Sequence, residues 1–323
     1  MSWFDAIEKG VLRWLSPGGA HGLSILIYHR VLPAPDPLFP DALERDGFAA
    51  QLALLKTRFQ VLPLLEAVRL ARAGRLPPRA ACITFDDGYA DNAEVALPLL
   101  QQYGLHATFF IATGFLNGGR MWNDTIIETV RRAPQDVLDA RALGLGSHPL
   151  GSMGQRRQAL EALIGQLKYQ PMAQRQVAVD QLAQLAGVPL PTDLMMSDAQ
   201  VRQLHAAGMG IGGHTVNHPI LARLPADEAR REIAAGKQAL EQLLGAPVEL
   251  FAYPNGKPDE DYRAEHVAMV REAGFEAAVS TAWGASRAPD FFQLPRFTPW
   301  DRHPRRFTLR LARNLRQPAA LAA

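Results

Sequence analysis

The sequence predicts an α/β fold, namely a distorted (β/α) barrel of about seven parallel strands that carries a helical insertion. Short apolar runs alternate with segments of helical periodicity, which is typical of a mostly parallel sheet with helices outside it. No G-x-G-x-x-G turn follows an apolar run and no G-x-x-x-x-G-K-[ST] loop occurs, so the fingerprints of nucleotide-binding folds are missing. A doubly wound open sheet is the alternative architecture.

The expected strands are apolar runs, and the expected helices lie between them. In chain order the strands are at 24–28, 81–85, 107–112, 208–212, 248–252, 277–281 and 292–297. Helical periodicity marks the segments 48–58, 64–73, 92–103, 226–244 and 259–273. Because helices separate successive strands, we expect the strands to run parallel.

The alternation breaks between about residues 115 and 197. This segment has helical patterns at 157–169 and 172–186 and no run that we expect to form a strand. Insertions on such barrels often wall the active site, because the catalytic loops share one face. The expected organisation is an N-terminal amphipathic helix (1–19), the barrel with its insertion (20–304) and a basic C-terminal helix or tail (305–323).

Composition excludes several classes of protein. The chain has 323 residues, of which 48% are apolar, and its formal net charge is only +2. A sizeable core is therefore expected, and a nucleic-acid partner is not, since such binders usually carry a clustered basic excess. The single cysteine, Cys82, excludes a disulfide framework and stands in an apolar run, where we expect it to be buried.

Both ends of the chain are amphipathic. Apolar residues recur at helical spacing near the N-terminus, and arginines alternate with apolar residues near the C-terminus: Trp3, Phe4, Ile7, Val11, Trp14 and Leu15, then Arg305, Arg306, Phe307, Arg310, Leu311, Arg313, Leu315 and Arg316. No stretch reaches the roughly 18 apolar residues of a membrane span, and charges interrupt what would be a signal peptide. We expect a cytoplasmic protein, with peripheral attachment to the inner face of the membrane as a hypothesis. Helices packed on the outside of the domain are the alternative.

Two adjacent carboxylates follow the second expected strand, in Thr84-Phe85-Asp86-Asp87-Gly88. Adjacent carboxylates repel one another unless a cation or a shared proton stabilises them. A turn at Gly88 could bring both to one site, where one binds a metal ion and the other acts as a base. The alternative is an ordinary turn that caps the next helix.

Two histidines four residues apart follow another expected strand, in Gly213-His214-Thr215-Val216-Asn217-His218. Neutral imidazoles suit zinc and similar divalent ions. Together with Asp87 they would give three protein ligands and leave a fourth position open for water, which is the arrangement of a catalytic zinc site.

These motifs resemble those of the polysaccharide deacetylases with a NodB-homology domain, which form carbohydrate esterase family 4. The matching stretches are spread over about residues 24–300: Leu26-Ile27-Tyr28-His29, Thr84-Phe85-Asp86-Asp87-Gly88-Tyr89, Ala107-Thr108-Phe109-Phe110, His214-Thr215-Val216-Asn217-His218 and Phe251-Ala252-Tyr253-Pro254-Asn255-Gly256. The opening Tyr-His and Leu294-Pro295-Arg296 are most similar to the poly-N-acetylglucosamine deacetylase branch. The resemblance implies a distorted barrel, one divalent metal ion and hydrolysis of an acetamide.

The resemblance also implies roles for single residues. Asp86 would be the general base, and Asp87, His214 and His218 would bind the metal ion, for which zinc is the first candidate and nickel, cobalt, manganese and iron remain open. A backbone N–H in the loop at 253–256 would stabilise the oxyanion. Asn255 is the candidate donor and Tyr253 a candidate substrate contact; a simple β-turn is the alternative.

The sequence departs from the family pattern at two points. Ala252 stands where the family usually has an arginine that orients the base. Arg296 could replace this arginine, unless it forms a surface salt bridge. The usual late Leu-x-x-His, which supplies the general acid, is also missing. His29 and, more weakly, His303 are candidates, unless the water or Asp86 itself returns the proton.

Aromatic residues beside polar ones suit a sugar ring, which offers apolar faces and hydroxyls. Trp122 and Asp124 in the insertion are such a pair, with a buried tryptophan that anchors the insertion as the alternative; Trp283 and Trp300 raise the same choice. The sequence thus predicts a metal-dependent hydrolase that removes the N-acetyl group from a sugar in a glycan or in a lipid- or nucleotide-linked precursor. The alternatives are an amidohydrolase for non-sugar amides and a glycan- or lipid-binding scaffold with weakened catalysis.

Overall fold

The computed structural model describes residues 3–285, 290–299, 301 and 304–322. The chain divides into two compact units. The first contains Met1–Pro33, Leu43–Leu116 and Met196–Ala323, and the second contains Ala34–Ala42 and Asn117–Met195.

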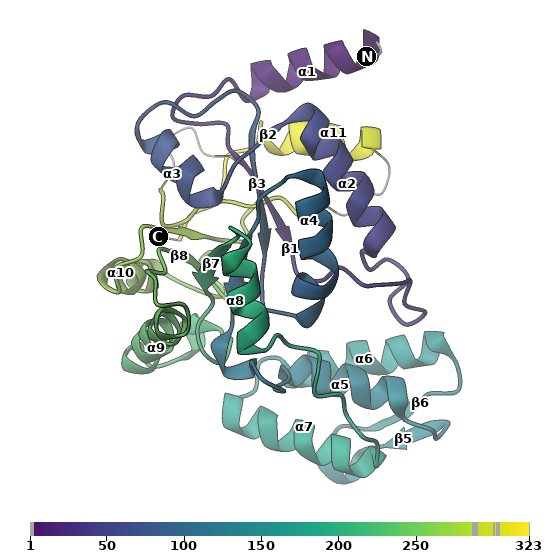
Figure 1. Cartoon of the computed structure of the whole chain (residues 1–323). Coiled ribbons are helices and arrows are strands. Elements are labelled where there is room, and N and C mark those ends of the chain that lie inside the picture. Colours follow the sequence, from purple (N-terminus) through teal and green to yellow (C-terminus); the bar gives the residue numbers. More distant parts are fainter. Residues whose placement is uncertain (1–2, 286–289, 300, 302–303, 323) are drawn as a thin grey trace. The chain divides into compact units, whose positions relative to one another are not determined.

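The first unit is built on a parallel sheet, in which the strands follow the order β1-β3-β4-β7-β8-β9 and β2 pairs with β3 (Figure 1). The strands are β1 (Ser24–Tyr28), β2 (Gln60–Val61), β3 (Ala80–Phe85), β4 (Thr108–Ile111), β7 (Gly210–Gly213), β8 (Leu250–Ala252) and β9 (Ala277–Val279). Parallel bridges join Val279 to Leu294 and Leu26 to Phe297, so residues 292–297 link the last strand back to the first. This arrangement confirms the distorted (β/α) barrel.

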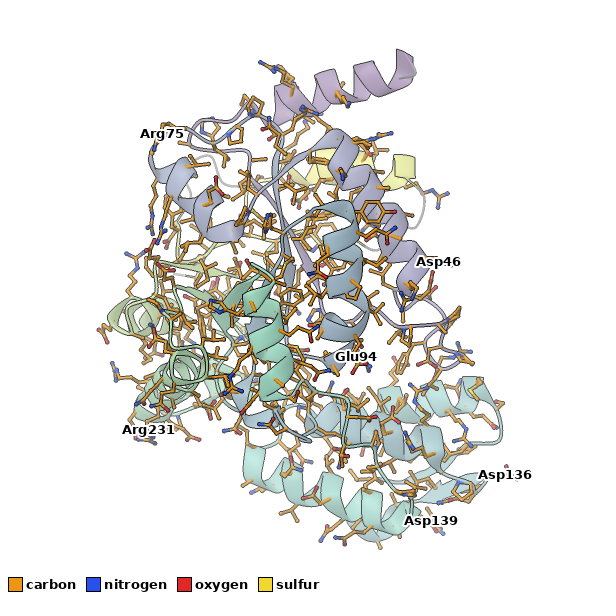
Figure 2. All side chains as sticks on the ribbon, viewed as in Figure 1. Asp46, Arg75, Glu94, Asp136, Asp139 and Arg231 are labelled. Carbon is orange, nitrogen blue, oxygen red and sulfur yellow. The ribbon has the colours of Figure 1, made fainter. Side chains whose placement is uncertain are left out.

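Helices lie outside this sheet. They are α1 (Trp3–Leu15), α2 (Arg45–Arg58), α3 (Leu64–Arg72), α4 (Leu97–Tyr103), α8 (Asp198–Ala206), α9 (Ala226–Leu244), α10 (Ala264–Glu272) and α11 (Pro304–Asn314). Short helical turns are η1 (Asn92–Ala96), η2 (Thr113–Phe115) and η4 (Leu221–Arg223). Charged side chains such as Asp46, Arg75, Glu94 and Arg231 point away from this core into solvent (Figure 2).

Some expected elements differ from those observed. Residues 292–297 form single bridges and no regular strand, because Pro295 has no N–H to donate to a ladder. The helix expected at 259–273 begins only at Ala264, since Asp259 has a φ of 65° and Pro258 bridges to Tyr262 in a turn. Strand β2 and helix α8 were not expected; β2 is only two residues long and carries no readable pattern.

The sheet is packed closely around β7, which is rich in glycine. A Cβ atom at Gly212 would lie 2.4 Å from Cδ1 of Phe110 and 3.0 Å from the carbonyl oxygen of Leu250. Only glycine at position 212 therefore lets β7 lie this close to β4 and β8.

The second unit is mainly helical. It contains α5 (Trp122–Arg132), α6 (Met153–Leu167) and α7 (Met172–Ala186), together with an antiparallel hairpin of β5 (Val137–Asp139) and β6 (Ser147–Pro149) and the turn η3 (Arg141–Leu143). The hairpin and α5 were not expected in the insertion. Leu38 is buried in the apolar cluster of these helices, and Asp36 accepts two hydrogen bonds from Arg131, so the short segment Ala34–Ala42 belongs to this unit.

The two amphipathic ends form helices α1 and α11, which contact each other. Leu12 on α1 and Phe307 and Leu311 on α11 are buried. Helix α11 ends at Asn314, earlier than the expected 305–323 segment. Trp300, His303 and the side chains of Trp3, Phe4, Ile7 and Arg305 lie outside the described residues. None of the helices in the described ranges is long and apolar enough to cross a membrane.

Candidate active site

The residues expected in the site lie where the parallel strands end. His29 follows β1, Asp86 and Asp87 follow β3, and His214 and His218 follow β7. Because parallel strands end at the same edge of a sheet, chain segments more than 100 residues apart meet there. The structure thus brings the acidic pair and the histidine pair together.

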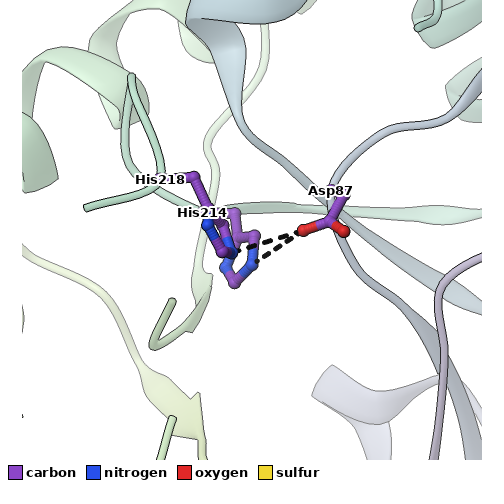
Figure 3. A group of neighbouring side chains, drawn as sticks. All are labelled: Asp87, His214 and His218. Atoms are coloured by element: carbon purple, nitrogen blue, oxygen red, sulfur yellow. Dashed lines mark ion pairs between the residues drawn. The ribbon is translucent and has the colours of Figure 1, made fainter. Parts of the chain in front are cut away.

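Asp87, His214 and His218 converge on one point (Figure 3). Oδ1 of Asp87 lies 3.5 Å from Nε2 of His214 and 3.4 Å from Nε2 of His218. Ligands bound tetrahedrally at about 2 Å would lie about 3.3 Å from one another, so these distances suit a small divalent ion. The buried Oδ1 of Asp87 has no hydrogen-bond partner in the described part of the chain. One carboxylate and two imidazoles are ligands that zinc and its neighbours accept, and the residues therefore fit a metal ion.

A hydrogen bond fixes the orientation of the His214 ring. Its Nδ1 lies 2.7 Å from the carbonyl oxygen of Ala252 at the end of β8. Because a carbonyl only accepts hydrogen bonds, we assign the proton to Nδ1, which leaves Nε2 to face Asp87. This second contact of a ligand histidine is typical of metal sites.

Burial and charge set the protonation of the three groups. Burial alone would raise the pKa of Asp87, but the neighbouring His214 and His218 outweigh it and hold that pKa below its usual range. Burial lowers the pKa of His218 to about 4, so this ring is neutral at neutral pH. Burial would also lower the pKa of His214, but the carboxylates of Asp86 and Asp87 raise it above its ordinary value. A proton and a metal ion would therefore compete for Nε2 of His214.

Asp86 is paired with Arg296. Oδ1 and Oδ2 of Asp86 accept hydrogen bonds of 2.7 and 2.6 Å from Nη1 and Nη2 of Arg296, which is only 1% exposed. Arg296 also donates from Nε to the carbonyl oxygen of Ser280 and from Nη1 to Oγ1 of Thr84. Burial would raise the pKa of Asp86, but the guanidinium of Arg296, together with His214 and His29, outweighs it and lowers that pKa. Arg296 therefore does not form a surface salt bridge. Its guanidinium binds the carboxylate of Asp86, the residue that the missing family arginine was expected to orient.

His29 and Asn255 complete this edge of the sheet. His29 is exposed, and its charge contributes to the lowered pKa of Asp87. Its carbonyl oxygen accepts a hydrogen bond from Nδ2 of Asn92. Asn255, three residues beyond the carbonyl that holds His214, has a φ of 57°, and its backbone N–H donates to no described residue. An unused N–H at this position can serve as a donor to a ligand.

Tyr253 is not a substrate contact, and this expectation was wrong. Its side chain is 0% exposed, its ring stacks on Tyr262 at 3.9 Å, and its hydroxyl donates to the carbonyl oxygen of Phe292. An aromatic residue after a strand can turn into the core as readily as toward a ligand, and the turn at 259–262 provides Tyr262 as its partner.

Trp122 and Asp124 lie at the start of α5 in the second unit. The guanidinium carbon of Arg175 lies 4.6 Å from the centre of the Trp122 ring, which packs against the apolar cluster of that unit. Asp124 is buried. These contacts agree with a tryptophan that anchors the insertion, and substrate binding by the pair stays a prediction. Trp283 lies beside Phe297 and Arg310.

One residue that the sequence reasoning missed is Glu232 on α9. It is buried and accepts hydrogen bonds from the loop between the two histidines. The sequence does carry a signal for it, because Glu232 lies on the apolar face of α9, between Ala229 and Gly236. A charged side chain at such a position usually has a specific partner.

Comparison with known proteins agrees with this fold. The profile of the polysaccharide deacetylase family matches residues 73–278. The Bacillus subtilis (strain 168) protein YxkH is 21% identical over 292 residues, which cover 90% of this chain and 75% of YxkH. The Streptococcus pyogenes deacetylase PplD has a TM-score of 0.59 at 20% identity, covering 87% of this chain and 92% of PplD. IcaB from Ammonifex degensii has a TM-score of 0.58 at 20% identity, covering 92% and 98%. The chain belongs to the polysaccharide deacetylase family, as its motifs predicted.

Proposed function

We propose that this protein is a metal-dependent deacetylase that removes the acetyl group from an N-acetylated sugar of a glycan or glycan precursor. Membership of the family makes it a hydrolase of the C–N bond in N-acetylated sugars. The observation that carries the metal dependence is the convergence of Asp87, His214 and His218 around a buried carboxylate oxygen that lacks a hydrogen bond. Zinc is the first candidate ion, and nickel, cobalt, manganese and iron fit the same ligands.

Asp86 is the proposed general base. A divalent ion held by Asp87, His214 and His218 would supply Lewis-acid activation of water and of the acetyl carbonyl. Asp86 takes the proton of the attacking water, and Arg296 keeps this carboxylate ionised and oriented. The carbonyl carbon gains the water oxygen and loses the amine, so that acetate and the free amino sugar are the products.

Two further residues act on the rest of the substrate in this proposal. The backbone N–H of Asn255 donates a hydrogen bond to the oxygen that becomes negative in the transition state. His29 gives a proton to the leaving amine, because its exposed ring lies close enough to lower the pKa of Asp87. The complete ligand set and the oriented base support turnover over a mere binding scaffold, since a binder needs no buried base.

The experiment is to measure metal content and acetate release together. Purified wild-type protein is expected to hold about one divalent ion per chain and to release acetate from N-acetylglucosamine oligosaccharides. His214→Ala should lose both the ion and the activity, whereas Asp86→Asn should keep the ion and lose the activity. Release of acetate only from non-sugar amides would favour the amidohydrolase, and metal binding without any turnover would favour the scaffold.

We further propose that the partners include an anionic membrane surface. Trp14 and Val11 on α1 and Leu309 on α11 are exposed, and Arg306 and Arg313 on α11 are exposed beside them. Exposed apolar side chains among cations are typical of helices that bind at the membrane interface. This combination supports a lipid surface over a neutral protein partner.

This membrane surface would lie at the opposite edge of the sheet from the active site. The carbonyl oxygen of Ser16, just after α1, accepts a hydrogen bond from the N–H of Arg79, just before β3. Asp86 lies at the other end of β3, about 20 Å away for six residues at ~3.3 Å each. A saccharide chain that extends from the bilayer is therefore a better substrate than a single sugar at its surface.

Sedimentation with vesicles tests the membrane contact. Wild-type protein should sediment with vesicles that contain phosphatidylglycerol and less with pure phosphatidylcholine, and Trp14→Ser and Arg313→Glu should each weaken sedimentation. Tyr169→Ser, which changes an exposed aromatic residue in the second unit, is the control. Equal sedimentation of all four proteins would contradict the proposed surface.

A further inference from the structure

We propose that Glu232 is a positioning residue, which holds the loop from His214 to His218 in the conformation that binds the metal ion. This inference rests on the proposed function in one respect, which is that the loop carries two ligands of a metal ion. Glu232 lies on α9, which follows the loop in the chain and packs against β7.

Glu232 binds the loop at the two residues between Thr215 and His218. Its Oε2 accepts hydrogen bonds from the backbone N–H groups of Val216 (2.9 Å) and Asn217 (2.8 Å). Its Oε1 accepts a hydrogen bond of 2.7 Å from Nδ2 of Asn217. The residue is 9% exposed, and no lysine, arginine or histidine pairs with it among the described residues. Its charge is therefore balanced by the loop's own donors.

The loop needs such support because its backbone is strained. Thr215 has a φ of 65° and His218 a φ of 52°, in the left-handed region that β-branched residues in particular avoid. Backbone of this kind persists only where the surrounding structure enforces it. Within the loop, Thr215 Oγ1 donates to the carbonyl oxygen of His214 and accepts from the N–H of His218. These internal bonds close the turn but do not fix it to the barrel.

Two further contacts hold the loop, one from α9 and one from η2. One turn after Glu232, Gly236 lies so close to the loop that a Cβ atom would be 2.8 Å from the carbonyl carbon and oxygen of Thr215. The N–H of Gly114, in η2 after β4, donates to the carbonyl oxygen of Val216. Glu232 supplies the charge-assisted part of this support, and its loss should let His218 move away from Asp87.

The matched variants are Glu232→Ala, Glu232→Gln and Asp227→Ala. Gln keeps one oxygen for the two backbone donors and loses only the acceptor for Asn217, so it should rescue most of the function. Asp227 lies on the same helix, has a side chain that is 69% exposed and forms an ion pair with Arg231 four residues later. It controls for the loss of an acidic residue from α9.

The main readout is metal affinity, measured by competition between the protein and a chelator for Zn²⁺. Loss of a residue that orients metal ligands typically weakens binding about 10- to 100-fold, which is the expectation for Glu232→Ala. Glu232→Gln should bind more tightly than Glu232→Ala, and Asp227→Ala should match the wild type. The absorption spectrum of bound Co²⁺ should change in Glu232→Ala, because the ligand geometry changes. Wild-type affinity and spectrum in Glu232→Ala would overturn the proposal.

A second measurement separates this proposal from the proposed function. Hydrogen exchange of the Val216 and Asn217 amides in metal-free protein should be fastest in Glu232→Ala, which removes their acceptor, and intermediate in Glu232→Gln, whose neutral oxygen is a weaker acceptor than the carboxylate. Thermal unfolding of Glu232→Gln should remain similar to that of the wild type. If wild-type protein binds no metal ion, the proposed function and the metal part of this inference both fail, and exchange still decides whether Glu232 holds the loop. Unchanged exchange would show that it does not. Should Glu232→Ala fail to fold, Glu232→Gln and Asn217→Ala replace it in both experiments.

Discussion

Arg296 and Asp86 form a bidentate ion pair although they lie 210 positions apart in the chain. The pair exists because residues 292–297 bridge to β1, which in turn pairs with β3, so both residues reach the same edge of the barrel. Both side chains are buried, and the guanidinium is also held by Ser280 and Thr84. The carboxylate of Asp86, the proposed base, is therefore oriented by the last segment of the barrel.

Replacing Arg296 should change the pH dependence of the reaction. Burial raises the pKa of Asp86, and among the groups that lower it Arg296 comes first, so Arg296→Gln should raise that pKa. A base must be ionised to accept a proton; the rate would therefore begin to fall at a higher pH as the solution is acidified. We expect the acid limb of kcat/KM to move upward and kcat to fall by about 100-fold. Arg271→Gln, which breaks an exposed pair with Asp290, is the control, and an unmoved acid limb would rule out this role.

The proposed general acid can be tested with two leaving groups. An amine leaves only after it gains a proton, whereas an aryl oxide leaves without one. His29→Ala should therefore lower kcat on an N-acetylglucosamine oligosaccharide by about 100-fold and that on an aryl acetate by less than about threefold. Equal losses on both substrates would instead assign His29 to substrate binding or to the structure of the site.

Asn255 is expected to act through its backbone. Asn255→Gly keeps the N–H and suits the φ of 57°, so kcat should stay close to wild type. Asn255→Ala should lower stability by about 1 kcal/mol, because alanine is strained in left-handed backbone. Steady-state kinetics and thermal unfolding measure the two effects. A large loss of kcat in Asn255→Gly would move the role to the side-chain amide.

Packing around β7 should make Gly212 intolerant of any side chain. Gly212→Ala would place a methyl group 2.4 Å from Cδ1 of Phe110, which is buried and cannot move aside. Overpacking of this kind should lower the free energy of unfolding by about 3 kcal/mol. On the exposed face of α6, a Cβ atom at Gly165 would meet nothing within 4 Å. Gly165→Ala should therefore raise the free energy of unfolding by about 0.5–1 kcal/mol. Denaturant unfolding compares them, and an unaffected Gly212→Ala would disprove the close approach.

Periodicity predicted most of the barrel, because continuous apolar runs in buried parallel strands are hard to mistake. The bounds expected for the strand at 24–28 and for the helix at 226–244 agree with those of β1 and α9. The sequence could not show that Pro295 reduces the last strand to single bridges, nor that a two-residue strand such as β2 exists. Helix α5 was missed because the whole segment was interpreted as an insertion of two helices.

For the site, spacing predicted which residues belong together but not how they are held. Asp87, His214 and His218 are recognisable from their residue types at strand ends. The pairing of Arg296 with Asp86 depends on closure of the barrel, which no local pattern reports. Tyr253 was misplaced because the sequence does not say which way a side chain turns after a strand ends. The direction became clear only with Tyr262 stacked on it.

The second unit is assembled from two separate pieces of chain, and this limits how it can be moved or lost. Excising Asn117–Met195 alone would leave Leu38 without the apolar cluster that buries it and Asp36 without Arg131. A graft of the helices alone onto another barrel would in turn lack the Leu38 side chain. The helical unit is thus not a portable module, and its gain or loss requires coordinated change in two loops that lie more than 70 residues apart in the gene product.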